Sequence, residues 1–253
     1  MKRDYVCMLR IFIDSFPSFI RNSRFLFEIA KKFFGLPDSL FYFREEFFQG
    51  KIIDLKPYYE LNSLKSLNRI SPQTNINSRH FNFILKELIE YKPSHVLDIG
   101  CGNGYLLNKF RKISKDINLT GIDFQTNYQN IKNSKINFIE GDIHQELMKI
   151  QSKSFDFVLC THVLEHLINP SLVVKEIRRI CSGTLIIICP LEKKFRWGFN
   201  YHIQFFHNSK SFINFLNFTK SPEEMNKKFK TYKYLGDLMY LEFLDSSILI
   251  KSP

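Results

Sequence analysis

The sequence lacks several features that would each assign a chain to a special class. None of its apolar runs approaches the roughly 18 residues that a membrane-spanning helix needs, because polar residues interrupt each one. The five cysteines show no paired short spacing, so we expect reduced thiols, no disulfide framework and no metal site. The apolar stretch after Met1 contains Arg10 and Asp14 and has no small-residue cleavage site. We therefore predict a cytoplasmic protein without a secretory signal.

The chain is basic, with a formal net charge of +11. A basic surface attracts nucleic acid, anionic lipid or phosphorylated substrates. However, lysine, isoleucine, asparagine, phenylalanine and tyrosine are all abundant while glycine numbers only 10, which is the bias of an AT-rich genome. Charge alone therefore identifies no partner.

Residues 78–253 alternate short apolar runs with amphipathic segments, which is typical of an α/β sheet. The expected strands are His95–Ile99, Asn118–Asp123, Ile136–Glu140, Phe155–Cys160 and Thr184–Cys189. Beyond Pro190, a helix is expected over Ser209–Phe218, and the stretches Tyr234–Phe243 and Ser247–Lys251 would complete the sheet, for which an antiparallel pair is one arrangement. The pattern predicts one catalytic domain over residues 78–253.

Three earlier helices are predicted from apolar residues at helical spacing. Ser78 would cap the first, Asn169 and Pro170 would start the third, and Gly183 would follow its end. Their apolar faces comprise Phe81, Ile84, Leu85 and Leu88 in the first, Leu106, Phe110 and Ile113 in the second, and Val173, Ile177 and Ile180 in the third.

Residues 1–77 differ in composition, because they are rich in phenylalanine and tyrosine with basic residues between them. The apolar residues at helical spacing are Phe16, Ile20, Phe27, Ala30 and Phe34. We expect a separate helical cap or lid. Because Arg21, Arg24, Lys31 and Lys32 lie on the same segment, a helix on a membrane surface is the alternative, although amphipathic helices more often pack on their own domain.

A glycine-rich turn follows the first predicted strand of the sheet. It reads Asp98-Ile99-Gly100-Cys101-Gly102-Asn103-Gly104 and leads into a helix. Glycines let the backbone approach a ligand closely, and the start of the helix offers N–H groups to a polar ligand. A nicotinamide dinucleotide site fits less well, because Gly104 comes one residue early and Tyr105 stands where a small residue is needed.

This segment resembles motif I of the class I S-adenosylmethionine-dependent methyltransferases. Asp123, at the end of the second strand, matches the family's ribose-binding acid, and Phe124 follows it. Asp142 matches the residue that accepts from the adenine amino group, with Ile143 beside the ring. The resemblance implies a Rossmann-like seven-stranded sheet with helices on both faces and S-adenosyl-L-methionine as cofactor. The carboxylate of Asp123, at the end of a parallel strand, suits that role physically.

The segment from Phe155 to His166 resembles the small-molecule subgroup that contains the ubiquinone-type O-methyltransferases. The resemblance implies that the cofactor-binding residues are Asp98, Gly100, Cys101, Gly102, Asn103, Gly104, Asp123, Phe124, Asp142, Ile143, Thr161 and His162. Two departures from the family are a short turn at Cys181-Ser182-Gly183 and a loose match beyond Ser221. They leave the substrate side of the site less determined than the cofactor side.

Histidines are the expected catalytic residues, because an acceptor hydroxyl must lose a proton and histidine has a suitable ordinary pKa. Position favours His166 and His202, although His166 could equally be a packed or capping residue, and Glu165 is expected to be structural. We predict O-methylation of a small-molecule or lipid-linked metabolite. The alternatives are a non-catalytic cofactor-binding regulator and a nucleic-acid methyltransferase, which the missing Pro-Pro-aromatic segment disfavours. The oligomeric state is not predicted.

Overall fold

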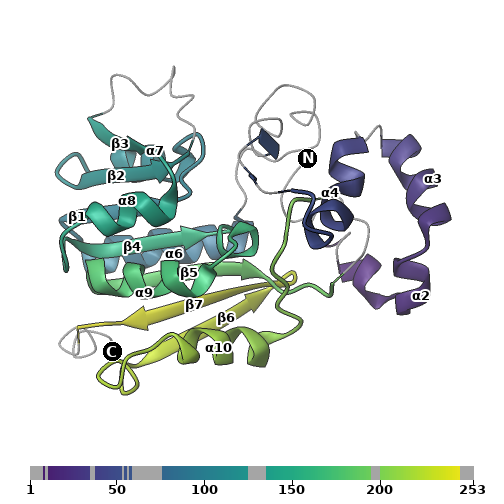
Figure 1. The fold of residues 1–253 in the computed structure, drawn as a ribbon. Coiled ribbons are helices and arrows are strands. Elements are labelled where there is room, and N and C mark those ends of the chain that lie inside the picture. The colour runs from purple at the N-terminus through teal and green to yellow at the C-terminus, as the bar shows by residue number, and fades with distance from the viewer. Residues whose placement is uncertain are drawn as a thin grey trace.

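The computed structural model describes residues 8, 11–34, 38–52, 54–55, 57–58, 76–124, 135–194 and 200–245. Within these residues a seven-stranded sheet has helices on both faces, and further helices lie beyond one of its ends (Figure 1). The strands are β1 (His95–Ile99), β2 (Asn118–Asp123), β3 (Ile136–Glu140), β4 (Phe155–Thr161), β5 (Cys181–Pro190), β6 (Phe229–Tyr234) and β7 (Asp237–Phe243). The helices around the sheet are α6 (Ser78–Tyr91), α7 (Tyr105–Ile113), α8 (Ile143–Lys149), α9 (Pro170–Ile180) and α10 (Ser209–Phe218), with a single 3₁₀ turn, η1 (Leu164–His166).

The strands are arranged in the order β3-β2-β1-β4-β5-β7-β6. Strands β1 to β5 are parallel to their neighbours, whereas β7 runs antiparallel to both β5 and β6. Because β1 lies between β2 and β4, successive connections leave it in opposite directions. Parallel sheets of this kind bind ligands at the carboxyl ends of the strands next to such a switch point.

Two apolar cores cover the two faces of the sheet. Helices α6 and α7 pack on one face through residues such as Ile84, Leu88 and Phe110. Helices α8, α9 and α10 pack on the other, where Val173, Ile177 and Leu216 are representative. The central strands are buried on both sides, so each reads as a near-continuous apolar run.

Most of the predicted elements are confirmed. Strands β1, β2 and β3 and helix α10 have the predicted bounds, and β4 is longer by Thr161. The predicted apolar faces of α6 and α9 pack inward, whereas Ile113 of α7 is exposed. The N-cap of α6 is Asn77 rather than Ser78, because the Asn77 side chain accepts from the backbone N–H of His80.

The prediction that Gly183 ends helix α9 is wrong. β5 begins at Cys181, directly after α9 ends at Ile180, so Gly183 lies inside the strand. A Cβ at this position would overlap the Tyr91 hydroxyl and the Asp156 carbonyl oxygen. Close packing, rather than a helix terminus, therefore requires this glycine.

The expected antiparallel pair exists, but one of its members differs from the prediction. Tyr234–Phe243 contains the end of β6, a hairpin at Leu235-Gly236 and all of β7, while Ser247–Lys251 lies outside the described residues. Strand β6 was missed because its lysines keep its hydropathy low, as is common for an edge strand.

Residues 11–34 do not form one continuous helix. Helix α2 (Ser18–Arg21) begins after Pro17, and Asn22 is its C-cap. Helix α3 (Arg24–Phe34) begins two residues after this C-cap. Phe27 is buried, whereas the side chains of Ala30 and Phe34 lie outside the described residues. Helix α4 (Asp38–Phe48) follows, and its Phe43 packs edge-on against Tyr201, with ring centroids 4.8 Å apart. Through this contact α4 lies against the segment that follows β5.

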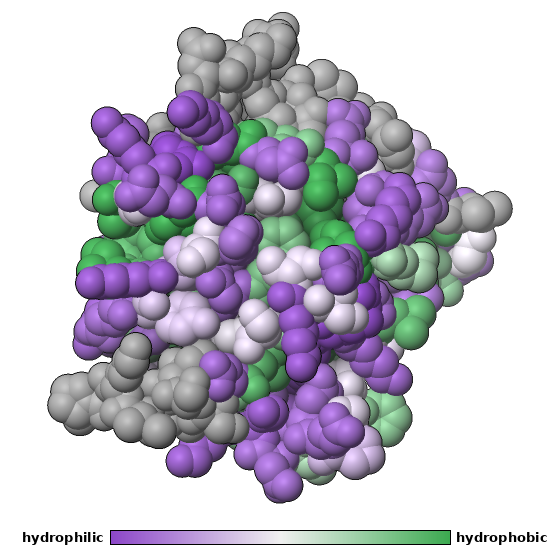
Figure 2. Space-filling model, turned by 90° about the vertical axis from the view of Figure 1, so that its left-hand side faces the viewer, coloured by the Kyte–Doolittle hydropathy of each residue, from purple (hydrophilic) through white to green (hydrophobic). Residues whose placement is uncertain are grey.

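At the opposite end of the sheet, the Asp156 carboxylate accepts from the backbone N–H groups of Ser94 and His95. Figure 2 views this side of the molecule, where hydrophilic side chains dominate and hydrophobic ones emerge only in small areas between them. None of the described helices is both long enough and apolar enough to cross a membrane.

Candidate active site

The glycine-rich turn connects β1 to α7 at the carboxyl end of the sheet. Gly100, Gly102 and Gly104 all have positive φ, at 68°, 54° and 69°. A Cβ at Gly100 would overlap the Val163 side chain, whereas a Cβ at Gly102 would meet no atom within 4 Å. The first glycine therefore allows the turn to pack on the segment after β4, and the second leaves space where a ligand can approach the backbone.

Asp98 precedes this turn and is almost completely buried, at 2% exposure. Its Oδ1 makes no hydrogen bond among the described residues. Burial, and then the nearby Asp123 carboxylate, raise the pKa of Asp98 to about 8. A buried carboxylate oxygen without a protein partner beside an open backbone turn fits a bound ligand that donates hydrogen bonds or carries positive charge.

Asp123 ends β2 beside the same turn. Its Oδ2 accepts from the Gly102 backbone N–H at 2.8 Å, while Asn103 Oδ1 accepts from the Tyr105 N–H at 3.1 Å. Phe124 follows Asp123 and is partly exposed. The structure thus brings Asp98, Asp123 and the glycines to adjacent positions, as the sequence predicts for a cofactor site.

Asp142, which is predicted to contact the adenine, has a structural function in the folded protein. It caps helix α8, because its Oδ1 accepts from the Gln145 N–H at 3.2 Å. The carboxylate stays exposed, and Ile143 packs against the core at the first position of α8. Since β3 and β2 are neighbours, Asp142 follows a strand that is paired with the one that ends in Asp123.

Thr161 and His162 lie where β4 ends, and both are buried. His162 has a positive φ of 56° and donates its backbone N–H to Ile188 at 2.8 Å. Its ring lies between two carboxylates, with Nδ1 3.2 Å from Glu165 Oε1 and Nε2 3.7 Å from Asp237 Oδ2. His162 therefore links the predicted cofactor side to a buried polar network.

The predicted catalytic histidines lie next to each other. The ring centroids of His166 and His202 are 4.8 Å apart, although the residues come from segments after β4 and after β5. His166 Nδ1 is 3.1 Å from the Tyr201 carbonyl oxygen, and His202 Nδ1 is 2.6 Å from Glu192 Oε1. Each ring is thus oriented by a hydrogen bond at Nδ1, which leaves Nε2 as the atom that can act on a ligand.

His166 differs in its acid–base properties from the sequence expectation of an ordinary histidine pKa. Burial, and then the neighbouring His202, lower the pKa of His166 to about 3. His166 is therefore neutral at physiological pH, and it is a weak proton acceptor.

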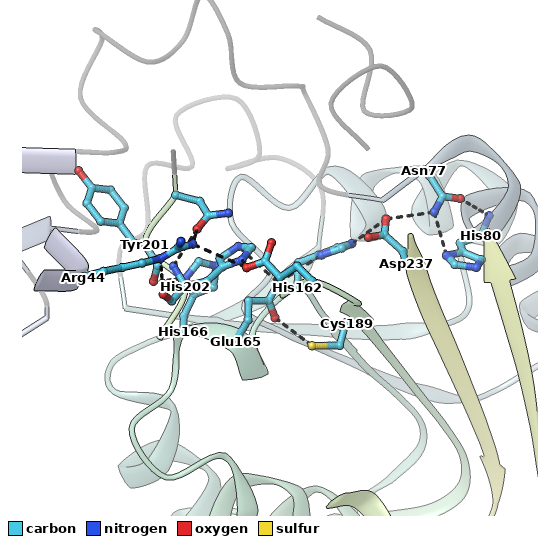
Figure 3. A network of polar contacts seen from close by, with 12 residues as sticks. Arg44, Asn77, His80, His162, Glu165, His166, Cys189, Tyr201, His202 and Asp237 are labelled. Atoms are coloured by element: carbon cyan, nitrogen blue, oxygen red, sulfur yellow. Dashed lines mark hydrogen bonds and ion pairs between the residues drawn. The ribbon is translucent and has the colours of Figure 1, made fainter. Parts of the chain in front are cut away.

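Arg44 connects the N-terminal helices to this network, which Figure 3 shows from close by. Its Nε donates to the His202 carbonyl oxygen at 3.1 Å, its terminal nitrogen donates to Asn200, and the same nitrogen lies 3.7 Å from Glu192. The guanidinium also stacks on the Phe205 ring at 4.8 Å. At the other end of the network, Asn77 donates to Asp237 at 3.2 Å.

Sequence reasoning missed Arg44, Glu192 and Asp237, and it assigned Glu165 to structure. Glu192 had a usable signal, because it comes two residues after the apolar strand β5 and therefore near the edge of the sheet where Asp123 ends β2. Arg44 had none, since it stands in a helix beside Glu45 and Glu46, where an exposed charge is the normal expectation.

Known proteins resemble this chain over the same region. Residues 97–188 match a family model described as a methyltransferase domain. A tRNA U34 carboxymethyltransferase from Nautilia profundicola is 27% identical over 176 residues, covering 60% of this chain and 53% of that protein. A ubiquinone biosynthesis O-methyltransferase from Coxiella burnetii is 30% identical over 134 residues, covering 51% and 56%. The chain thus spans about half the length of these relatives.

Among solved structures, the plantazolicin methyltransferase BpumL in complex with SAH and a monoazolic desmethyl analogue has a TM-score of 0.56. It is 19% identical, and the superposition covers 80% of this chain and 93% of that one. This likeness concerns the fold. The seven-stranded sheet has the Rossmann-like arrangement predicted from the sequence.

Proposed function

Because this chain belongs to the class I S-adenosylmethionine-dependent methyltransferases, we propose that it transfers a methyl group to a hydroxyl of a small-molecule or lipid-linked metabolite. The observation that carries the proposal is the adjacent pair of histidines, half-buried His166 and buried His202, beside the segment on which the glycine turn packs. A hydroxyl acceptor needs help to lose its proton, and imidazole nitrogens are the usual groups for that task.

The cofactor supplies an electrophilic methyl group on a sulfonium. On the proposed assignment, the backbone of Gly100 to Gly104 lies along its amino-acid portion, Asp98 accepts from its ammonium group, and Asp123 accepts from its ribose hydroxyls. Asp142 and Ile143 hold the adenine, while Cys101, Phe124, Thr161 and His162 line the remainder. The buried and unbonded Asp98 Oδ1 supports this assignment, because a cationic donor would compensate its burial.

On the acceptor side, His202 is the better proposed base. Its Nδ1 lies 2.6 Å from Glu192 Oε1, so the carboxylate fixes the ring and favours a proton on Nδ1. Nε2 then faces Glu165 and His166 and can accept a proton from a hydroxyl. His166, with its lowered pKa, orients the acceptor by a hydrogen bond instead.

The N-terminal residues 1–77 are proposed to form a cap over this acceptor side. Arg44 and Phe43 of α4 contact the segment 200–205 directly, so a movement of α4 would reach His202. Hydrogen exchange of residues 38–48 with and without cofactor measures this coupling, and protection that is unchanged by any ligand would contradict a cap.

Exposed apolar residues on the N-terminal helices favour a lipid-linked acceptor over a freely soluble one. Phe19, Phe25 and Ile29 are exposed by 75%, 72% and 51%. Arg24 and Lys32 are exposed on the same segment. Exposed aromatic residues next to cations suit an anionic lipid surface.

Incubation with S-adenosylmethionine labelled on its methyl group tests the proposal directly. An acceptor panel of catechols, sugars and lipid-linked quinols is compared with bulk tRNA, because one relative is named for a tRNA modification. Label in an alkali-stable ether of a small molecule supports the proposal. Label only in tRNA would replace it with nucleic-acid methylation, and cofactor binding without any transfer would favour a regulatory protein.

A further inference from the structure

Three side chains of the acceptor side have the composition of a metal site. Glu165, His166 and His202 each present one ligating atom, and these atoms all lie within 4.8 Å of one another. His202 Nε2 is 4.0 Å from Glu165 Oε1. Two imidazoles and one carboxylate, with further positions left for water or substrate, form a common catalytic set for divalent transition-metal ions.

The hydrogen bonds around the two histidines match those of metal ligands. A ligating histidine almost always donates its other ring N–H to a carboxylate or a backbone carbonyl. Here His202 Nδ1 pairs with the Glu192 carboxylate and His166 Nδ1 with the Tyr201 carbonyl oxygen. Both contacts orient the Nε2 atoms, and they are independent of the proximity of the three ligating groups.

Glu165 is held from both sides as well. His162 Nδ1 lies 3.2 Å from its Oε1, and the Cys189 thiol donates to its Oε2 at 3.6 Å. These two contacts orient the carboxylate, as outer hydrogen bonds do for the ligands of a metal ion.

The charges of the network also favour a cation. Glu165, Glu192 and Asp237 are three buried carboxylates, whereas Arg44 is the permanently charged cation that contacts the same network. A divalent ion would offset part of this buried negative charge.

From these observations we infer that Glu165, His166 and His202 bind one divalent transition-metal ion. Bonds of about 2.0–2.2 Å to the ion require the ligating atoms to approach one another by roughly an ångström, which rotation of the side chains can supply. This assignment replaces the sequence expectation that the chain has no metal site.

The catalytic consequence rests on the proposed function. An ion at this position takes the acceptor oxygen as a further ligand and lowers the pKa of its hydroxyl. The O–H bond then breaks with loss of the proton to solvent, the oxygen forms a bond to the methyl carbon, and the carbon–sulfur electron pair returns to sulfur. With the ion bound, His202 would act as a ligand, and the ion would take over the part in deprotonation that is proposed above for the free imidazole.

Titration of Co²⁺ alone into tag-free, metal-stripped protein tests the site, with visible absorption and calorimetry as readouts. The variants are Glu165→Gln, which keeps the size of the side chain, and His166→Ala. His207→Ala is the control, because His207 is exposed and outside the cluster. S-adenosylmethionine binding and the thermal unfolding temperature verify that each variant is folded.

We expect one Co²⁺ per chain in the wild type and in His207→Ala, with affinity at least tenfold weaker in Glu165→Gln and His166→Ala. A folded wild type that binds the cofactor but no Co²⁺, or equal Co²⁺ affinity in all four proteins, would overturn the inference. Stoichiometric Co²⁺ binding in a protein that methylates no hydroxyl would keep the metal site and reject the proposed O-methylation. Methylation that chelator treatment leaves unchanged would overturn the catalytic role of the ion.

Discussion

The two sides of the site are built from the chain in different ways. The proposed cofactor side comprises the turn at residues 98–104 and single residues that end β2 and follow β3, all within one run of βα units. The acceptor side combines Arg44 of α4, Glu165 and His166 after β4, and Glu192 and His202 after β5. A local turn can be read from neighbouring residues, whereas a site assembled from distant segments depends on how they pack.

The largest effect should come from the acceptor side. His202→Asn keeps a polar side chain of smaller size but removes the Nε2 function, so we expect kcat to fall by about 10²- to 10⁴-fold. Cofactor affinity should stay within a few fold, because His202 lies outside the predicted cofactor contacts. Single-turnover transfer and calorimetry separate the two quantities. Equal losses in both would mean that the two sides are not separable.

A substitution in the glycine turn should weaken the binding of the cofactor. Gly100→Ala places a Cβ against Val163 at a residue with a φ of 68°, so the turn must move. We expect at least tenfold weaker binding of S-adenosylmethionine and a loss of about 1–3 kcal/mol in the free energy of unfolding. Denaturant unfolding of the protein without ligand measures the loss in the free energy of unfolding. Gly50→Ala is the matched control, because Gly50 also has positive φ but has nothing within 4 Å.

The pKa of Asp98 should make stability depend on pH in the absence of ligand. The pKa is 3.8 in an ordinary environment and about 8 in the folded protein, so between these values the folded state holds the proton that the unfolded state has lost. The contribution of Asp98 to stability therefore falls as pH rises from about 4 to about 8, and is constant above that range.

Asp98→Asn removes this titration with little change in shape. The free energy of unfolding of the variant minus that of the wild type should be larger at pH 8.5 than at pH 5. Urea unfolding of both proteins at both pH values measures this difference. A stability difference that is the same at both pH values would show that Asp98 does not titrate in this range.

The smallest effect is expected for the exposed face of the N-terminal helices. Phe25→Ser should reduce co-sedimentation with anionic vesicles by several fold at low salt, because an exposed aromatic ring is lost from the lipid contact. Methyl transfer to a soluble acceptor should not change. Phe218→Ser is a suitable control, since Phe218 is 86% exposed but belongs to α10, in the sheet domain. No binding of the wild type to vesicles would remove lipid contact from the proposal.

The sequence predicted the proposed cofactor side of the site better than the proposed acceptor side. The bounds of β1, β2 and β3 and the approach of Asp98 to Asp123 follow from apolar runs and from the rule that parallel strands end at one edge. The pairing of Glu192 with His202 could not be derived, because the two residues are separated along the chain beyond the last strongly apolar strand, and because His202 is also held by Arg44 of the distant helix α4. Burial also changed the chemistry of His166, whose lowered pKa no local pattern indicates.

The separation of the two sides is tested most directly by titrating S-adenosylmethionine into the wild type, Asp123→Ala and Glu165→Gln. Asp123→Ala removes a charged acceptor from the cofactor side, which is typically a loss of about 1.5–3 kcal/mol. We expect binding at least tenfold weaker in Asp123→Ala and within threefold of the wild type in Glu165→Gln. A folded wild type that does not bind the cofactor, or an Asp123→Ala variant that binds as tightly as the wild type, would contradict the assignment of the glycine turn and β2 as the cofactor site.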